Sequence, residues 1–117
     1  MIVEDTELNR DLLVQIFENG YDLMTAADGE TAVRLAAASK PDLILMDIGL
    51  PGISGLDAVR AIRADSSLPR MPIVAVSSSV MPEDRERALE AGCDEFVAKP
   101  IDDEALVELV RGLLAER

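Results

Sequence analysis

The sequence contains no histidine and no tryptophan, and it has a single cysteine. Without histidine, the chain cannot use an imidazole as a general acid, a general base or a metal ligand. Because Cys93 has no second cysteine to pair with, it cannot form an internal disulfide, and a buried structural thiol is favoured over a redox sensor. Any chemistry must therefore depend on carboxylates, hydroxyl groups and amines.

Basic residues and long apolar runs are also scarce. Among 117 residues, 11 are basic and 23 are acidic, which gives a net charge of -12. Nucleic-acid binding requires clustered basic residues that neutralise phosphates, so no direct contact with DNA or RNA is expected. No apolar run approaches the roughly 18 residues that span a bilayer, and no signal sequence opens the chain. We therefore expect no membrane insertion and a protein of the reducing cytoplasm.

Hydrophobic residues make up 49% of the chain, enough to fill the core of one domain, which we expect to span residues 1–117. Short apolar runs alternate with longer amphipathic stretches along the whole sequence. The apolar runs predict strands at Met1–Val3, Asp22–Ala26, Leu43–Met46, Ile73–Val76 and Glu95–Ala98.

The stretches between these strands predict helices. Apolar residues recur at helical spacing within Leu8–Ile16, Ala32–Ala36 and Leu56–Ile62. A fourth helix is predicted over Pro82–Ala91, because proline suits the first helical position and Gly92 suits a left-handed residue after the helix. Gly20 is interpreted as the stop of the first helix for the same reason. The last helix is predicted to begin near Asp102, where acidic residues favour a helix start.

This alternation predicts an α/β fold. Right-handed crossovers place helices on both faces of a mostly parallel sheet. The expected architecture is a flavodoxin-like, doubly wound, five-stranded parallel sheet with strand order 2-1-3-4-5, in a three-layer α/β/α sandwich. Such folds bind ligands at the carboxyl ends of the strands, so the residues after each apolar run are the candidates for function.

Acidic, hydroxyl and amine side chains occupy those positions. They are Glu4 and Asp5 after the first run, Asp47 and Ser77 after the third and fourth, and Lys99 after the fifth. Two carboxylates about 5 Å apart repel by roughly 3 kcal/mol at an effective dielectric near 20, a cost that a cation would relieve. Oxygen ligands without histidine or cysteine favour Mg²⁺.

Asp47 is the candidate nucleophile, because it closes the least polar run. With its charge screened by a metal, its carboxylate could attack a phosphoryl group and form an aspartyl phosphate. Lys99 and Ser77 would supply donors to the oxygens of the transferred group. Each residue also has a plain structural interpretation: Glu4 and Asp5 could cap a helix, Lys99 could form a surface ion pair and Ser77 could start a turn. That all of these purely structural interpretations hold at once, on one edge of the sheet, is less favoured than a phosphoryl-transfer site.

Several segments together resemble a known family. They are Ile2–Asp5 with Asn9, Pro41–Asp47, Leu50–Gly55, Pro72–Ser77, and Ala91–Asp94 with Lys99–Pro100. Over nearly its whole length, the chain resembles a response-regulator receiver domain, the phosphoacceptor of two-component signalling. The resemblance implies a signalling switch that catalyses only its own phosphorylation and dephosphorylation, and not a conventional enzyme. Gly52 and Gly55 are interpreted as serving backbone geometry in the loop after the nucleophile.

The resemblance also implies a role for each site residue. Asp47 would be phosphorylated, and Mg²⁺ would be bound by Asp5 and Asp47. Glu4 would contribute through water, and the backbone carbonyl of Gly49 would complete the protein ligands. A cis peptide bond before Pro100 is implied as well.

In the same family pattern, Ser77 and Phe96 form the switch that reports phosphorylation, while the cis bond aims Lys99 inward. Phe96 stands where tyrosine is more frequent and Ser77 where threonine is more frequent. The lost tyrosine hydroxyl is expected to alter partner recognition, whereas the hydroxyl that faces the phosphate is kept. The fourth helix, the last strand and the last helix would form the readout face.

The implied partners are a histidine kinase or histidine phosphotransfer protein, since the chain has no histidine of its own, and a downstream protein target. A stand-alone regulator, a phosphorelay intermediate and a domain of a longer chain all stay open, and Met1 favours the first. Receivers usually carry several more residues before the Ile2–Asp5 segment, so a short first strand is expected.

Three alternative functions fit the sequence less well. A haloacid-dehalogenase-like phosphohydrolase would need a second aspartate two residues after the nucleophile, where this chain has Gly49. A flavodoxin-like module would need a phosphate-binding loop after the first strand, where Glu4 and Asp5 would repel the phosphate, and aromatic residues are only 3% of the chain. A degenerate receiver that binds partners constitutively is disfavoured by the intact set of Asp47, Ser77 and Lys99.

Overall fold

The computed structural model describes residues 1–49, 54–78 and 81–115. Within these ranges five strands form one parallel sheet, in the order β2-β1-β3-β4-β5. The strands are β1 (Ile2–Val3), β2 (Thr25–Ala26), β3 (Ile44–Asp47), β4 (Ile73–Ser77) and β5 (Glu95–Ala98). The predicted sheet topology is therefore confirmed.

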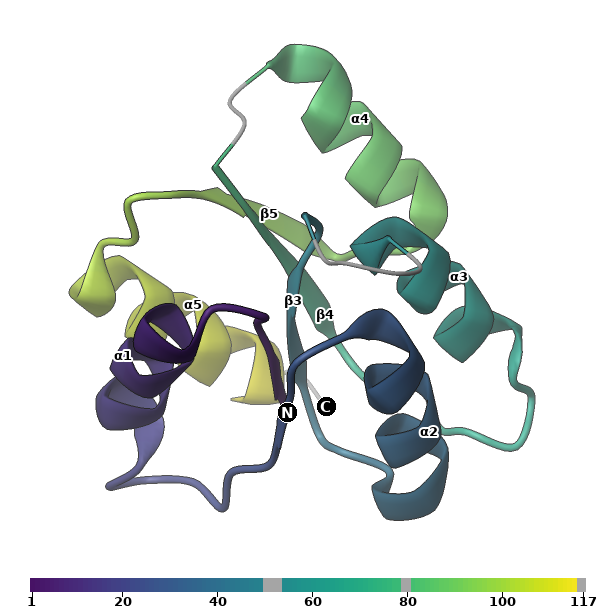
Figure 1. Cartoon of the computed structure of the whole chain (residues 1–117), viewed down its shortest axis with the longest axis horizontal. Helices are drawn as coiled ribbons and strands as arrows, with labels where there is room; N and C mark the ends of the chain where they lie inside the picture. The colour runs from purple at the N-terminus through teal and green to yellow at the C-terminus, as the bar shows by residue number, and fades with distance from the viewer. Residues whose placement is uncertain (50–53, 79–80, 116–117) are drawn as a thin grey trace.

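Five helices alternate with these strands in the described ranges and cover both faces of the sheet (Figure 1). They are α1 (Glu7–Phe17), α2 (Gly29–Ser39), α3 (Gly55–Ala64), α4 (Pro82–Ala91) and α5 (Asp103–Ala115). α1 and α5 pack on one face, and α2, α3 and α4 pack on the other. This arrangement is the expected three-layer sandwich.

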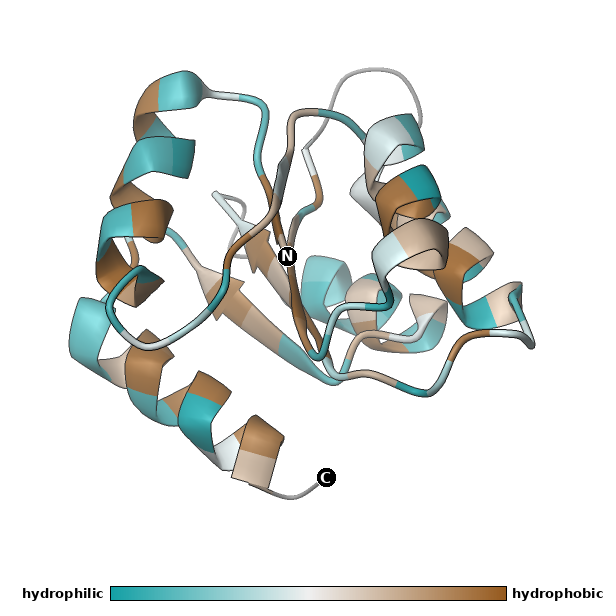
Figure 2. Ribbon diagram, turned by 90° about the horizontal axis from the view of Figure 1, so that it is seen from below, coloured by the Kyte–Doolittle hydropathy of each residue, from teal (hydrophilic) through white to brown (hydrophobic). Residues whose placement is uncertain are grey.

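The sheet separates two hydrophobic cores. Along β3, Ile44 and Met46 pack into the core under α2, α3 and α4, whereas Leu45 packs into the core under α1 and α5. This alternation follows from the pleat, which points successive side chains to opposite faces. β3 and β4 are buried on both faces, so their residues form continuous apolar runs. Figure 2 shows mostly hydrophobic strands between helices banded in both colours.

β2 is much shorter than predicted, and α1 buries fewer of its apolar residues than predicted. β2 covers only Thr25–Ala26, because it lies at the sheet edge and pairs only with the two residues of β1. On α1, Leu8 and Leu12 are 68% and 50% exposed, and the buried residues are Leu13 and Phe17. The apolar arc of α1 is wider than the face that reaches the sheet, so periodicity alone predicted the helix and not its buried side.

The helix ends also differ in detail. α1 ends at Phe17, and the amide of Gly20 donates to the Phe17 carbonyl at 3.2 Å without adopting the left-handed conformation, so the predicted glycine stop is wrong. α2 ends instead on a left-handed Lys40 with φ 47°, which no sequence signal indicated. α5 begins one residue later than predicted because Asp102 is its cap: its Oδ1 accepts from the amide of Ala105 at 3.2 Å.

The bounds of α4 and the burial of Cys93 agree with the prediction. α4 begins at Pro82, and Gly92 follows its last residue with φ 119°. Cys93 is buried, and burial raises the pKa of its thiol to about 11, so it stays protonated at neutral pH. No helix in the described ranges is both long and apolar enough to cross a membrane. The motif residues 50–53, Gly52 among them, lie outside the described residues.

Gly92→Ala should destabilise the protein. The positive φ disfavours any side chain, and an added Cβ would lie 2.8 Å from Cγ of Arg63. We expect the free energy of unfolding, measured by urea denaturation, to fall by about 1–3 kcal/mol. Gly112→Ala is the matched control, because Gly112 lies inside α5 with nothing within 4 Å of the added atom. That change should stabilise by about 0.5–1 kcal/mol, and equal effects of both substitutions would contradict this account.

Candidate functional site

The carboxyl edge of the sheet gathers the candidate site residues. They are Glu4 and Asp5 after β1, Asp47 at the end of β3, Ser77 at the end of β4 and Lys99 after β5. One carboxylate oxygen from each of the three acidic residues lies within 4.8 Å of the others. The structure thus brings together the acidic side chains that the sequence analysis placed at one edge.

The three acids differ in exposure. Glu4 is 1% exposed and Asp47 is 8% exposed, whereas Asp5 is exposed at the rim. Glu4 and Asp47 are buried because Glu4 directly follows β1 and Asp47 ends β3, and both strands lie inside the sheet. The amide of Glu4 donates to the Ala26 carbonyl at 3.0 Å, and Asp47 pairs with Val76 of β4. The site therefore has two acids on its floor and one at its mouth.

Lys99 is the cation of this cluster. Its Nζ lies 3.4 Å from Oε2 of Glu4 and 3.6 Å from Oδ2 of Asp47. One ammonium group thus pairs with the two buried acids of the cluster. Lys99 is held in place through its backbone, because its amide donates to the Ser77 carbonyl at 2.7 Å. The peptide bond between Lys99 and Pro100 is cis.

Glu4 is the most deeply buried acid of the cluster. The pKa of its carboxyl is raised from 4.5 to about 7, chiefly by burial and in addition by the neighbouring Asp47, while Lys99 opposes the rise. Its Oε1 is buried without any hydrogen-bond partner. Buried polar atoms in proteins are nearly always partnered, so an orphaned carboxylate oxygen beside two other acids fits a hard divalent cation with oxygen ligands.

Asp47 is positioned by two glycines. The amide of Gly49 donates to its Oδ1 at 2.9 Å. Gly55, the first residue of α3, lies so close to the Asp47 carbonyl and the Ile48 Cα that a Cβ would clash with both. Gly55 therefore serves backbone geometry, as predicted, by allowing α3 to start directly against the strand end.

Ser77 and Phe96 lie on neighbouring strands. Ser77 is 5% exposed, and its partner across the β4–β5 pair is Ala98. Phe96 pairs with Ala75 two residues earlier on β4, is half-buried and packs against the core under α2, α3 and α4.

One contact at the site was missed from the sequence. Nη1 of Arg10, on α1, donates to the backbone carbonyl of Glu4 at 3.0 Å and so ties the helix to the end of β1. No sequence signal pointed to it, because an arginine on a helix is by default a solvated residue. A groove of about 720 Å³ lies beside this helix and is lined by Asn9 and Leu12 of α1 and by Ser78 and Lys99.

Comparison with known proteins decides the family. A family model for the response regulator receiver domain matches residues 1–111. The chain belongs to this family. This receiver is therefore a phosphoacceptor of two-component signalling and not a conventional enzyme.

Relatives of this receiver support the assignment along nearly its whole length. The polar-differentiation response regulators DivK of Brucella anthropi and Brucella melitensis are each 38% identical over 117 residues, which covers 99% of this chain and 95% of each relative.

Solved structures agree. The receiver domain of a sensor histidine kinase from Pseudomonas aeruginosa superimposes with a TM-score of 0.90 at 35% identity, covering 97% of this chain and 94% of that one. That structure has a magnesium ion coordinated in its active-site cleft. The chemotaxis protein CheY4 of Vibrio cholerae gives a TM-score of 0.89 at 26% identity, covering 96% of this chain and 94% of that one.

Glu4→Gln should stabilise the metal-free receiver, and only at high pH. A carboxyl whose pKa rises to about 7 on folding holds its proton more tightly in the folded state. Its contribution to stability is complete below the unfolded-state pKa of 4.5 and is lost as the pH rises from there to about 7. In urea denaturation with a chelator, we expect the variant to match wild type near pH 4 and to exceed it by about 2–3 kcal/mol at pH 8.5.

The free energy of unfolding of the variant is compared with that of wild type at each pH. Burial also lowers the pKa of the Met1 amino group to about 6, and because both proteins share this effect, it cancels in their difference. Glu7→Gln is the control, since Glu7 is an exposed residue of α1 outside the cluster. It should show no pH-dependent difference from wild type. A stabilisation by Glu4→Gln that is the same at both pH values would contradict the assigned cause.

Proposed function

We propose that residues 1–117 act as one receiver domain that accepts a phosphoryl group on the Asp47 carboxylate, with Mg²⁺ at the acidic cluster. The phosphoryl group would come from a phosphohistidine on a histidine kinase or histidine phosphotransfer protein. The observation that carries this proposal is the convergence of three carboxylate oxygens within 4.8 Å, beside the Lys99 ammonium and around an unpartnered oxygen of Glu4.

The residues present fit a magnesium ion. Asp5 and Asp47 would hold it directly, Glu4 through water, and Gly49 through its carbonyl. When bound, Mg²⁺ would neutralise the excess negative charge of the cluster and of the incoming phosphoryl oxygens. The support lies in the donor set, which consists of oxygens only, and in the magnesium-bound receiver from Pseudomonas aeruginosa.

Phosphoryl transfer follows from this arrangement. A carboxylate oxygen of Asp47 attacks phosphorus, the phosphorus–nitrogen bond of the donor phosphohistidine breaks, and the electron pair of that bond leaves with the imidazole nitrogen. Lys99 then pairs with a phosphoryl oxygen in place of its present contacts with Glu4 and Asp47, and the Ser77 hydroxyl donates to another. The Gly49 amide keeps the attacked carboxylate oriented through its hydrogen bond to Oδ1.

The phosphodonor needs access to Asp47, and the groove of about 720 Å³ that reaches Lys99 provides room beside the site. Leu12 on its wall is 50% exposed, which offers apolar surface to a protein partner. We place the reaction in the cytoplasm, where ATP supplies the phosphoryl group of phosphohistidine.

The signal would leave through Ser77 and Phe96 to the surface formed by α4, β5 and α5, which a downstream protein would recognise. Phe96 has no hydroxyl to present, so recognition would depend on the position of its ring and not on a hydrogen bond. The DivK relatives, of which this chain covers 95%, are response regulators named for polar differentiation.

Phosphorylation of Asp47 is tested by intact mass after incubation with acetyl phosphate. Wild type with Mg²⁺ should gain one phosphoryl group, because the ion is needed to offset the charge of the acidic cluster. Asp47→Asn, or wild type with a chelator, should gain none. Asp57→Asn is the matched control, since Asp57 is an exposed aspartate of α3, and it should behave as wild type.

A phosphoryl group on Asp47→Asn at the wild-type level would place the modification elsewhere. The same assay with purified histidine kinases labelled on their phosphohistidine identifies the partner, because the cognate kinase should lose its label to this receiver faster than the others do. Failure of every phosphodonor to modify wild type would overturn the proposed function.

A further inference from the structure

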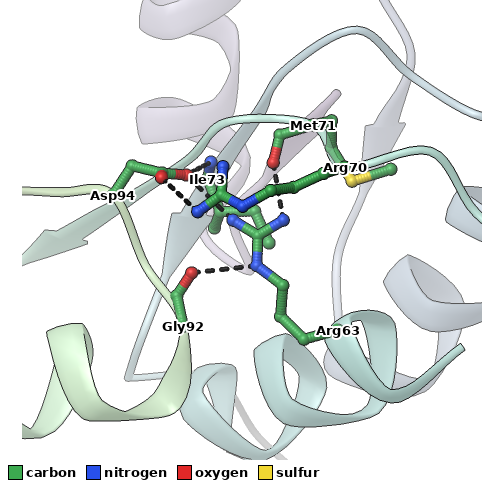
Figure 3. Close-up of polar contacts among 6 residues, drawn as sticks. All are labelled: Arg63, Arg70, Met71, Ile73, Gly92 and Asp94. Atoms are coloured by element: carbon green, nitrogen blue, oxygen red, sulfur yellow. Dashed lines mark hydrogen bonds and ion pairs between the residues drawn. The ribbon is translucent and has the colours of Figure 1, made fainter. Parts of the chain in front are cut away.

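The edge of the sheet opposite Asp47 carries a cluster of charged side chains, Arg63, Arg70 and Asp94, called the clasp below (Figure 3). Arg63 is a residue of α3, and all three nitrogens of its guanidinium donate hydrogen bonds. Its Nε donates to the Gly92 carbonyl at 2.9 Å, its Nη1 to the Met71 carbonyl at 2.7 Å, and its Nη2 to Oδ2 of Asp94 at 2.8 Å. One side chain thus joins α3 to the start of β4 and to the end of α4.

Asp94 completes the clasp from the segment between α4 and β5. Its Oδ2 also accepts from the amide of Ile73 at 2.8 Å, and its Oδ1 accepts from Arg70 at 2.6 Å. Burial by itself raises the pKa of this carboxyl, but the hydrogen bonds from Arg70 and Ile73 and the charges of the two arginines together outweigh it, so the pKa lies below its usual value. Asp94 is therefore ionised at neutral pH.

The two arginines contribute unequally. The side chains of Arg63 and Asp94 are 18% and 19% exposed, whereas that of Arg70 is 67% exposed. An exposed ion pair stabilises a fold very little, while a planar guanidinium with several acceptors in a partly buried site is hard to replace. The anchoring part of the clasp is therefore Arg63, and Arg70 lies at its rim.

α4 is held unevenly along its length. Its buried residues are Ala88 and Ala91, both in its carboxyl-terminal half, and Gly92 next to them accepts the bond from Arg63. In the other half, none of residues 82–87 is buried, and residues 83–87 are all charged. Met81 precedes the helix, is 54% exposed and gives it no side-chain cap.

We infer that the clasp fixes the carboxyl end of α4 and makes Gly92 the pivot about which the amino-terminal half of this helix opens. Local opening is cheapest where few apolar contacts are lost, so the free energy of opening rises from Pro82 towards Ala91. The amino-terminal half follows the carboxyl end of β4, where Ser77 lies, so this half of α4 is the one next to the site in the chain.

The rise in the free energy of opening along α4, called the gradient below, is a property of the unmodified protein. Movement of the amino-terminal half of α4 on phosphorylation of Asp47 rests on the proposed function. The test is amide hydrogen exchange of the full chain by NMR, expressed as protection factors so that intrinsic rates cancel. In wild type, the amides of Glu86 and Arg87 should be protected at least about 10-fold less than those of Glu90 and Ala91. Equal protection along α4 would overturn the inference without any variant.

Arg63→Lys tests the anchor, because lysine keeps the charge and cannot reach three acceptors at once. We expect protection at Glu90 and Ala91 to fall about 10-fold more than protection in β3, which reports the change in global stability. Arg70→Ala is the matched control and should leave the gradient unchanged. If both variants act alike, or if Arg63→Lys affects α4 and β3 equally, the assignment of the anchor to Arg63 is wrong.

Addition of Mg²⁺ and acetyl phosphate separates the inference from the function on which its use depends. With Asp47 modified, protection should change at residues 86–87 and stay constant at Glu90 and Ala91. A change that reaches both halves equally would overturn the pivot at Gly92. If mass spectrometry shows that Asp47 is not modified, the proposed function fails, while the gradient in the unmodified protein still stands or falls on its own measurement.

Discussion

The repulsion among buried carboxylates at one sheet edge is the constraint on which the rest of the site depends. A parallel sheet aligns the ends of its strands, so Glu4 and Asp47 meet because β1 and β3 are neighbours. Lys99 offsets only part of their charge, and the buried Oε1 of Glu4 has no hydrogen-bond partner. The same residual charge opposes folding and attracts a cation, so cation binding and stability depend on one electrostatic interaction.

Much of this arrangement follows from sequence alone, for physical reasons that can be stated. β3 and β4 are buried on both faces, which produces uninterrupted apolar runs, and the polar residue that ends such a run must lie at the sheet edge. The extent of β2 and the exposed side of α1 could not be predicted, because the first depends on its partner strand and the second on which part of a wide apolar arc meets the sheet. Leu8, for example, belongs to the apolar arc of α1 but is exposed.

Contacts made by long side chains to distant backbone carbonyls form the other unpredictable part. Arg10 reaches the carbonyl of Glu4, and Arg63 reaches those of Gly92 and Met71, and none of these acceptors is marked by residue type. The alternative of a dehalogenase-like phosphohydrolase finds no support at this level either. The position two residues after Asp47 contributes a backbone amide to the carboxylate and has no side chain to act as an acid.

The partition of the interior into two cores has a consequence for how substitutions combine. Helices α1 and α5 share one core, and α2, α3 and α4 share the other, with the sheet between them. Substitutions that share no contact have nearly additive effects on stability. Substitutions on the α1 side, which borders the groove at Lys99, should therefore change stability independently of substitutions in α4, which packs on the opposite side.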